Sequence, residues 1–308
     1  MRISRRKTTV ILASALIAGG IAAPAVALGD NGSRSSSSSS SRLDAVGLTE
    51  GGTKLVSFRT NDPRNTRDVG RVALAGANGD TRLVGIDHRV QNGKLYGVGD
   101  QGGIYVFERG SANGTLVGDL DPALEGRSFG VDFNPAANAL RVVSDTGQNL
   151  RQPFTTAAAG DQDTPDVPDE ATVVDGRLNY PAADGARGPD AGGISAAAYT
   201  NNDLSADTGT LLFDIDTALD QLANQNPANA GTLALIGKLR VGDVDPDAGF
   251  DIYSTVRRDA AVSNQGFATL TVNGKNRLYG IDLTSGQATE LGSFDRPVTD
   301  IAIPLAQR

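Results

Sequence analysis

The sequence predicts an all-β protein, a five-bladed β-propeller with four strands in each blade, and three observations support this fold class. One pattern recurs, as residues 43–63 and 95–114 show: an apolar strand, a glycine-containing turn, a second apolar strand and a polar turn. The repeat is about 45 residues long, which is typical of propeller blades. A glycine-apolar-aspartate motif, or one near it, also recurs on the first strand of each unit. Its five versions are Gly85-Ile86-Asp87, Gly130-Val131-Asp132, Gly193-Ile194-Ser195, Gly249-Phe250-Asp251 and Val298-Thr299-Asp300.

Four complete units follow one another along the chain, each with four apolar-rich segments between turn signals. The segments are 82–90, 94–99, 103–109 and 115–120; 128–134, 139–145, 148–154 and 171–180; 193–200, 210–214, 221–226 and 232–239; 249–255, 266–272, 277–282 and 288–294. An acidic, proline-containing insertion at 155–170 predicts a surface loop within the second of these units.

The two ends of the repeat region together predict the remaining blade. Residues 43–48, 54–60 and 68–74 make three strands that lack an innermost partner, and residues 298–304 make one strand without successors. Pairing the C-terminal strand with the N-terminal three closes the ring and leaves no open sheet edge. The alternative is a six-bladed ring, in which insertions at 203–208 and 227–231 of the long unit hide an extra blade.

The N-terminal residues predict export. Residues 1–27 combine a basic start, an apolar stretch and Ala25-Val26-Ala27, the pattern of a cleaved signal peptide; twin-arginine export and an uncleaved membrane anchor are the alternatives. Residues 28–42 contain a serine run and predict a solvated linker. We therefore expect a secreted, extracellular protein whose residues 43–308 form the propeller domain.

Charge and composition limit the partners. The formal net charge is −8, which argues against nucleic acid and anionic membranes. There is no cysteine, so disulfides and thiolate metal sites are excluded. We expect a monomer that binds an extracellular ligand or protein and has no membrane span after signal cleavage.

Residues 128–151, SFGVDFNPAANALRVVSDTGQNLR, resemble a family of exported bacterial proteins catalogued as domain of unknown function 4394. Four further stretches fit the same family, at 83–98, 198–202, 226–237 and 278–291, so that the resemblance covers essentially residues 43–304. The resemblance implies the propeller-like repeats and the export, and it implies no chemistry.

Carboxylates are the abundant functional groups. The chain has no cysteine and one histidine, His88, which excludes nucleophilic triads. Asp87, Asp132, Asp251 and Asp300 lie on predicted innermost strands and are candidates for a group of channel carboxylates. Such a group has three alternative roles: backbone acceptors that lock adjacent blades, ligands of a cation, or catalytic acids.

Two further candidate sites follow from polar motifs. Asp243, Asp245 and Asp247 alternate in an acidic segment, which indicates either a solvated loop or a calcium site; calcium is thus the alternative to our expectation that no cofactor is bound. The motif at 144–151 and the segment at 199–202 suggest a polar ligand patch on one face. Its tentative members are Asp132, Asn134, Arg141, Asp145, Asn149, Arg151, Tyr199, Asn201 and Asn202.

The function that we expect is an exported binding or scaffold module without catalysis. The alternatives are a carbohydrate-active hydrolase that uses paired channel carboxylates and a calcium-stabilised propeller. With no tryptophan, nine phenylalanines and six tyrosines, the chain is poor in the aromatic platforms that sugar-binding clefts use. A hydrolase would show its carboxylates in an open cleft, whereas a scaffold would show them bonded to the backbone.

Overall fold

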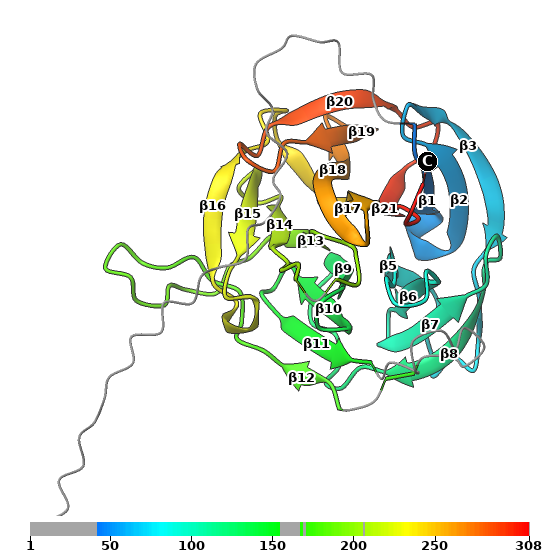
Figure 1. The fold of residues 1–308 in the computed structure, drawn as a ribbon, viewed down its shortest axis with the longest axis horizontal. Helices are drawn as coiled ribbons and strands as arrows, with labels where there is room; N and C mark the ends of the chain where they lie inside the picture. The colour runs from blue at the N-terminus through cyan, green and yellow to red at the C-terminus, as the bar shows by residue number, and fades with distance from the viewer. Residues whose placement is uncertain (1–41, 155–166, 169–170, 206, 308) are drawn as a thin grey trace, which may run out of the picture.

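A computed structural model describes residues 42–154, 167–168, 171–205 and 207–307. Within these residues there is no α-helix, and five antiparallel sheets are arranged around a central axis (Figure 1). The predicted five-bladed propeller is confirmed, and the six-bladed alternative is wrong. The insertions in the long unit form a loop and a short 3₁₀ turn, η2 (Ala228–Ala230), instead of an extra blade.

Blade 1 joins the two ends of the described chain, in the order β21-β1-β2-β3. Its strands are β21 (Val298–Ala302), β1 (Asp44–Thr49), β2 (Lys54–Arg59) and β3 (Asp62–Arg71). Strand β21 pairs antiparallel with β1, with Val46 opposite Ala302. The C-terminal strand therefore closes the ring as predicted.

The other four blades are antiparallel meanders whose first strand is innermost. Blade 2 contains β5 (Leu83–His88), β6 (Leu95–Gly99), β7 (Gly103–Phe107) and β8 (Asn113–Asp119), and blade 3 contains β9 (Phe129–Asn134), β10 (Ala139–Ser144), β11 (Asn149–Pro153) and β12 (Val173–Val174). Blade 4 contains β13 (Ile194–Tyr199), β14 (Leu212–Asp216), β15 (Gln221–Gln225) and β16 (Leu233–Lys238), and blade 5 contains β17 (Val244–Arg257), β18 (Ala260–Val272), β19 (Lys275–Ile281) and β20 (Ala288–Ser293).

Burial on both faces of the blades explains why many strands read as continuous apolar runs. Strand β6, for example, is buried along its whole length. The described residues form five apolar clusters, and each cluster lies in one of the five interfaces between neighbouring blades. The ring is thus held by sheet-on-sheet packing.

Glycines on the innermost strands allow these strands to come close together. A Cβ at Gly130 would lie 2.5 Å from the backbone nitrogen of Ala197 in the next blade, and one at Gly249 would lie 2.4 Å from the Cα of Asp300. A side chain at either position would force the blades apart. This close approach to the next blade is the physical reason for the glycine at three positions of the recurring motif, Gly85, Gly130 and Gly249.

Several strands differ from the prediction, and three of the differences change how the sheets are built. The short β4 (Ala73–Ala75) pairs in parallel with β8, so the end of the predicted segment 68–74 adds a fifth strand to the sheet of blade 2. Strand β12 has two residues, where 171–180 was expected to be extended throughout. The segment around Asp245, expected to be a solvated loop, is an exposed bulge at the start of β17, between the paired positions Val244 and Ala248.

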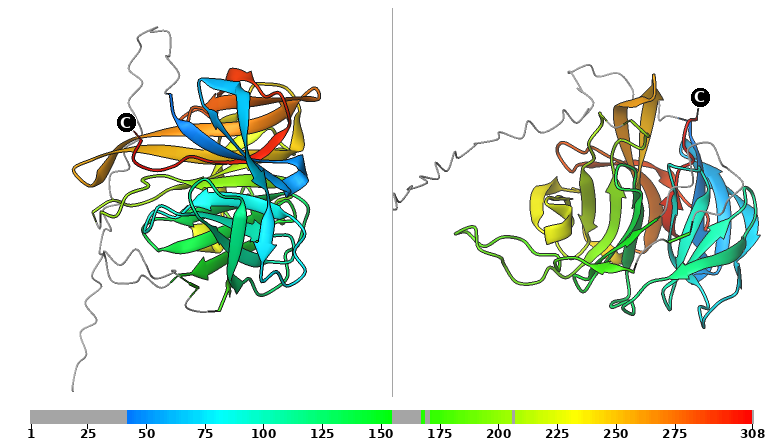
Figure 2. Two further views of the ribbon diagram at one scale, coloured as in Figure 1. Left: turned by 90° about the vertical axis from the view of Figure 1, so that its right-hand side faces the viewer. Right: turned by 60° about the horizontal axis from the view of Figure 1, so that its bottom comes forward.

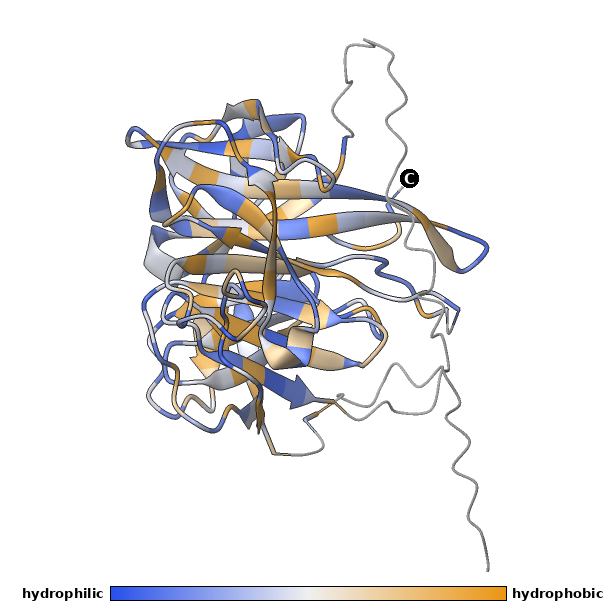
Figure 3. Cartoon of the chain, turned by 90° about the vertical axis from the view of Figure 1, so that its left-hand side faces the viewer, coloured by the Kyte–Doolittle hydropathy of each residue, from blue (hydrophilic) through white to orange (hydrophobic). Residues whose placement is uncertain are grey.

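Strands β17 and β18 form a ribbon of 14 and 13 residues that extends past the other blades (Figures 2 and 3). Its two-residue turn, Arg258 and Asp259, has positive φ angles of 52° and 66°, which match the twist of a tight hairpin. The ribbon is fastened to the loop of blade 4 by Asp203, whose carboxylate accepts a hydrogen bond of 2.8 Å from the Ala261 N–H.

Two predicted segments lie wholly or mostly outside the described residues. They are the N-terminal residues 1–42, of which only residue 42 is described, and the insertion at 155–170, of which residues 167 and 168 are described.

Candidate functional site

Three aspartates from three innermost strands meet on the propeller axis. Asp87 of β5, Asp132 of β9 and Asp251 of β17 each place a carboxylate oxygen within 4.8 Å of the others. We call these three residues the axial carboxylates. Their exposed fractions are 6%, 2% and 3%, so they lie in the interior and line no open cleft.

Each axial carboxylate accepts a hydrogen bond from a backbone N–H of the next blade. Asp87 accepts from Phe133 at 2.8 Å. Asp132 accepts from Tyr199 at 3.0 Å, and Asp251 accepts from Ile303 at 2.5 Å. The axial carboxylates therefore lock blade 2 to blade 3, blade 3 to blade 4 and blade 5 to blade 1.

These bonds also define the true alignment of the innermost strands. The donors show that Ala198 of β13 and Ala302 of β21 occupy the positions that correspond to the axial carboxylates. Two of the five predicted motif positions, Ser195 and Asp300, are consequently out of alignment with the other three. The sequence pattern missed this because a polar residue, Ser195 or Asp300, also stands three or two residues before the corresponding position, and the motif aligned with that residue instead.

The two remaining interfaces use substitute locks. Asp300 lies earlier on β21 than the axial position and accepts from the Ile86 N–H at 2.8 Å, joining blade 1 to blade 2. Between blades 4 and 5, the Asn202 side chain donates to the Ile252 carbonyl oxygen at 2.8 Å, and the Asn202 N–H donates to the Ser254 hydroxyl at 2.9 Å. Every interface thus has a polar lock close to the innermost strands.

Burial dominates the electrostatics of the axis. Loss of solvation raises the pKa of Asp87 and of Asp132 well above the ordinary value, and nearby carboxylates raise both further. Burial raises the pKa of Asp251 to about 7, opposed by hydrogen bonds from the backbone N–H groups of Ile303 and Ile252. Burial likewise raises the pKa of Asp300. Protonated carboxyls can keep these locks, because the carbonyl oxygen still accepts an N–H.

The polar ligand patch predicted from sequence is divided among several places. Arg141 is 1% exposed and lies between blades 3 and 4, where it donates to the Asn149 amide oxygen at 2.7 Å and the Tyr199 hydroxyl at 3.2 Å. Asp175, which sequence reasoning missed, pairs with Arg141 at 2.7 Å and with Arg151 at 3.1 Å. These four predicted residues do come together, but as a buried network with Arg151 at its edge.

The other predicted patch members have different roles. Asn134 accepts from the Ala136 N–H in its own turn and also hydrogen-bonds the Tyr199 side chain, which joins it to the network of Arg141. Asp145 accepts from the Arg127 N–H at 2.9 Å. Asn201 exchanges hydrogen bonds with Asn264 of the ribbon. Asp132 belongs to the axis, and Asn202 locks blade 4 to blade 5.

The predicted calcium segment gives no convergent group of ligands. Asp243, Asp245 and Asp247 lie before and along the start of β17. Within the described residues, the axial carboxylates are the group of three or more acidic or imidazole ligands that lie close enough to share an ion.

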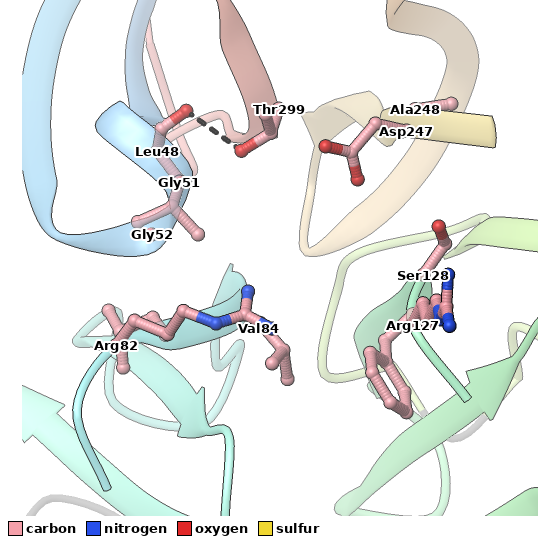
Figure 4. Close-up of a pocket in the computed structure, with 12 residues that line it drawn as sticks. Leu48, Gly51, Gly52, Arg82, Val84, Arg127, Ser128, Asp247, Ala248 and Thr299 are labelled. Atoms are coloured by element: carbon pink, nitrogen blue, oxygen red, sulfur yellow. Dashed lines mark hydrogen bonds between the residues drawn. The ribbon is translucent and has the colours of Figure 1, made fainter. Parts of the chain in front are cut away.

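A small cavity opens where the innermost strands begin, and we call it the mouth cavity (Figure 4). Its volume of about 30 Å³ is far below the roughly 300–1,000 Å³ that is typical of small-molecule sites. Gly52 forms part of its wall; with φ at 92° and a hypothetical Cβ 2.0 Å from the Leu83 carbonyl oxygen, this position requires glycine. Four innermost strands and the 3₁₀ turn η1 (Glu50–Gly52) contribute to the lining.

Three charged side chains line the mouth cavity: Arg82 before β5, Arg127 before β9 and Asp247 on β17. Arg82 lies 3.8 Å from Asp100 and is 41% exposed. Figure 4 shows Arg82 and Asp247 reaching toward the centre from different blades. Burial raises the pKa of Asp247, and the charge of Arg82 opposes that change. Sequence reasoning missed both arginines, because neither belongs to the repeated motif.

The fold and the axis together define a five-bladed β-propeller whose buried aspartates join the blades. The chain belongs to the family described as Domain of unknown function 4394, whose model matches residues 54–302. This confirms the resemblance found in the sequence. A comparison with curated proteins finds no match.

Solved structures that resemble the chain share little sequence with it. A nidogen/laminin complex structure gives a TM-score of 0.45 at 11% identity and covers 86% of this chain and 99% of that chain. A protein from Lactobacillus plantarum gives 0.40 at 14% identity, with 85% and 99% covered. A protein of unknown function from Bacteroides thetaiotaomicron gives 0.43 at 13% identity, with 87% and 68% covered. None of the described residues forms a helix long and apolar enough to cross a membrane.

Proposed function

We propose that this protein is a non-catalytic binding module, a rigid propeller that presents the loops at the two ends of its blades to an extracellular partner. One observation supports the proposal most strongly: the carboxylates that a hydrolase would need are buried and bonded to neighbouring blades. The basic and apolar pattern of residues 1–27 supports the extracellular location.

A retaining or inverting glycosidase needs its two carboxylates beside a bound sugar, in a cleft that the substrate can enter. The axial carboxylates instead lie in the interior, with exposed fractions of 6% or less. The mouth cavity has too little volume, about 30 Å³, for a sugar ring. Substrate would reach Asp132 only if the blades separated, and the locks described above oppose that separation.

The test separates a structural from a catalytic role of Asp132. In Asp132→Ala the Tyr199 N–H loses its acceptor, which costs about 1–3 kcal/mol of folding free energy and lowers the melting temperature by roughly 2–4 °C per kcal/mol. Asp132→Asn keeps an acceptor oxygen, so we expect a smaller loss. Asp245→Ala, at an exposed position of β17, is the matched control and should melt like the unchanged protein.

The same variants are assayed on a panel of chromogenic glycosides. We expect no hydrolysis by any of them, including the unchanged protein. Hydrolysis by the unchanged protein that disappears in Asp132→Asn, with an unaltered melting temperature, would overturn the proposal in favour of the hydrolase.

A further inference from the structure

Two arginines of neighbouring blades line one cavity and have little else to bind. Arg82 of blade 2 makes a single ion pair with described residues, to Asp100, and its 3.8 Å separation is too long for a hydrogen bond. Arg127 of blade 3 is exposed, and its side chain has no hydrogen bond or ion pair within the described part of the chain. Both guanidinium groups therefore keep donors available for a ligand.

The backbone fixes the place of both arginines. Asp145 accepts the Arg127 N–H at 2.9 Å, and Asp100 accepts the Thr81 N–H at 2.8 Å beside Arg82. Arg82 directly precedes β5, and Arg127 lies two residues before β9. Both of these innermost strands are largely buried, so the core of the ring holds the backbone of each arginine in place. Such positioning reduces the entropy that is lost when a ligand binds.

The local charge contrasts with that of the whole protein. The chain carries a formal net charge of −8, yet the charged lining of the mouth cavity consists of two arginines and one aspartate, Asp247. Planar guanidinium groups match the geometry of a carboxylate and bind it through paired hydrogen bonds. A cavity of about 30 Å³ admits a group of that size and excludes a ring.

We propose that the mouth cavity binds a carboxylate group, presented by an acidic side chain on a loop of a protein partner, between Arg82 and Arg127. This inference rests on the proposed function and names the contact through which the propeller recognises its partner. Asp247 weakens the site by repelling the incoming charge, and it thereby limits binding to partners that make further contacts with the surrounding loops.

The experiment is an NMR titration of the arginine Nε–Hε signals with the peptide acetyl-Gly-Glu-Gly-amide. We expect the signals of Arg82 and Arg127 to shift and the glutamine peptide acetyl-Gly-Gln-Gly-amide to leave them unchanged. Arg82→Gln and Arg127→Gln should each weaken binding about fivefold, which corresponds to the upper range for an exposed charge pair. The matched control is Arg257→Gln, an exposed arginine at the far end of β17 from Asp247, and it should bind like the unchanged protein.

A gain of affinity gives a second test that a purely structural role would not pass. Asp247→Asn removes the repulsion and should tighten binding of the glutamate peptide. Equal shifts with both peptides, equal binding by all three arginine variants, or stronger shifts with inorganic phosphate than with the glutamate peptide would each overturn the proposal. None of these outcomes bears on hydrolysis or on the locks at Asp132, so the proposed function can stand or fail separately.

Discussion

At the scale of single residues, the buried aspartates contribute as hydrogen-bond acceptors for the backbone of the next blade more than as charges. Asp87 and Asp132 are almost completely buried, and each replaces the water that a backbone N–H of the next blade would otherwise need. Ala198 and Ala302 occupy the two corresponding positions of the ring. Their methyl side chains are small, which leaves room for three carboxylates near one point. The residue type at this position thus depends on what its neighbours around the ring contribute.

The first prediction concerns pH. Burial raises the pKa of Asp251 to about 7, from an ordinary value of 3.8, and also raises the pKa values of Asp87 and Asp132. A raised pKa means that the folded state holds more protons than the unfolded chain, so stability is lost as pH rises from about 4 through 7. We expect a higher melting temperature at pH 5 than at pH 8, measured by circular dichroism.

Surface carboxylates affect stability at lower pH than the buried aspartates do. Hydrogen bonding to Lys54 lowers the pKa of Asp68, and ion pairing with Arg187 and Arg177 lowers that of Asp190, so these groups lose their contribution only below about pH 4. Asp251→Asn is the control and should reduce the difference between pH 5 and pH 8. A melting temperature that is constant or increases over this range would contradict the assignment.

At the scale of strands, the ring depends on one element from the far end of the chain. β21 is the innermost strand of blade 1. It supplies Asp300, which accepts from blade 2, and the Ile303 N–H directly after it donates to Asp251 of blade 5. Its buried residues Val298 and Ile301 belong to the apolar cluster between blades 5 and 1. Each of the other four innermost strands pairs with the strand that follows it directly in the sequence.

The second prediction is that deleting residues 298–308 opens the ring. The truncated chain would leave β1 with an unpaired inner edge and would remove two of the interblade locks. We expect aggregation or a large loss of cooperative unfolding, measured by light scattering and calorimetry. Deleting only residues 305–308, which follow the buried Ile303, is the control; a longer deletion that remains soluble and melts unchanged would contradict closure.

A strand could be predicted accurately from the sequence where nearby residues alone determine its bounds. β9 and β10 were expected at nearly their observed bounds, because apolar runs between turn residues specify them. β12 was overestimated, since only two residues pair with β11 and the chain then crosses to blade 4. The start of β17 was missed because its acidic, proline-containing residues have low strand propensity, and they form a bulge between the paired positions Val244 and Ala248.

At the scale of the whole molecule, all five interfaces between blades are stabilised in the same two ways. Each of the five interfaces has its own apolar cluster and at least one polar bond from an innermost strand or its adjoining loop. The fivefold repeat in sequence could predict this architecture, because packing between successive units repeats with it. It could not predict the mouth cavity, whose arginines come from the connections between blades and recur in no motif.

The third prediction concerns calcium. The axial oxygens already accept backbone N–H groups, and burial favours their protonated forms, which bind cations weakly. We expect the same thermal unfolding curve in millimolar calcium and in chelator. A cation bound only to the folded state would add about 2.7 kcal/mol at a hundredfold excess over its dissociation constant.

The double substitution Asp245→Asn and Asp247→Asn, compared with Asp251→Asn, locates any ion that does bind. A rise in melting temperature with calcium would contradict the prediction. If the rise disappears in Asp251→Asn, the ion lies on the axis; if it disappears in the double variant, the ion lies at the start of β17.

The closure of blade 1 also determines how the molecule would respond to mechanical tension. Asp44 at the start of β1 exchanges hydrogen bonds with Gln307, and Val46 lies opposite Ala302 at the end of β21. Both ends of the described chain therefore leave the same end of one antiparallel strand pair. A force that pulls these ends apart would peel β21 from β1 one bonded pair at a time, instead of shearing all the pairs together, so blade 1 is the place where the ring would open first.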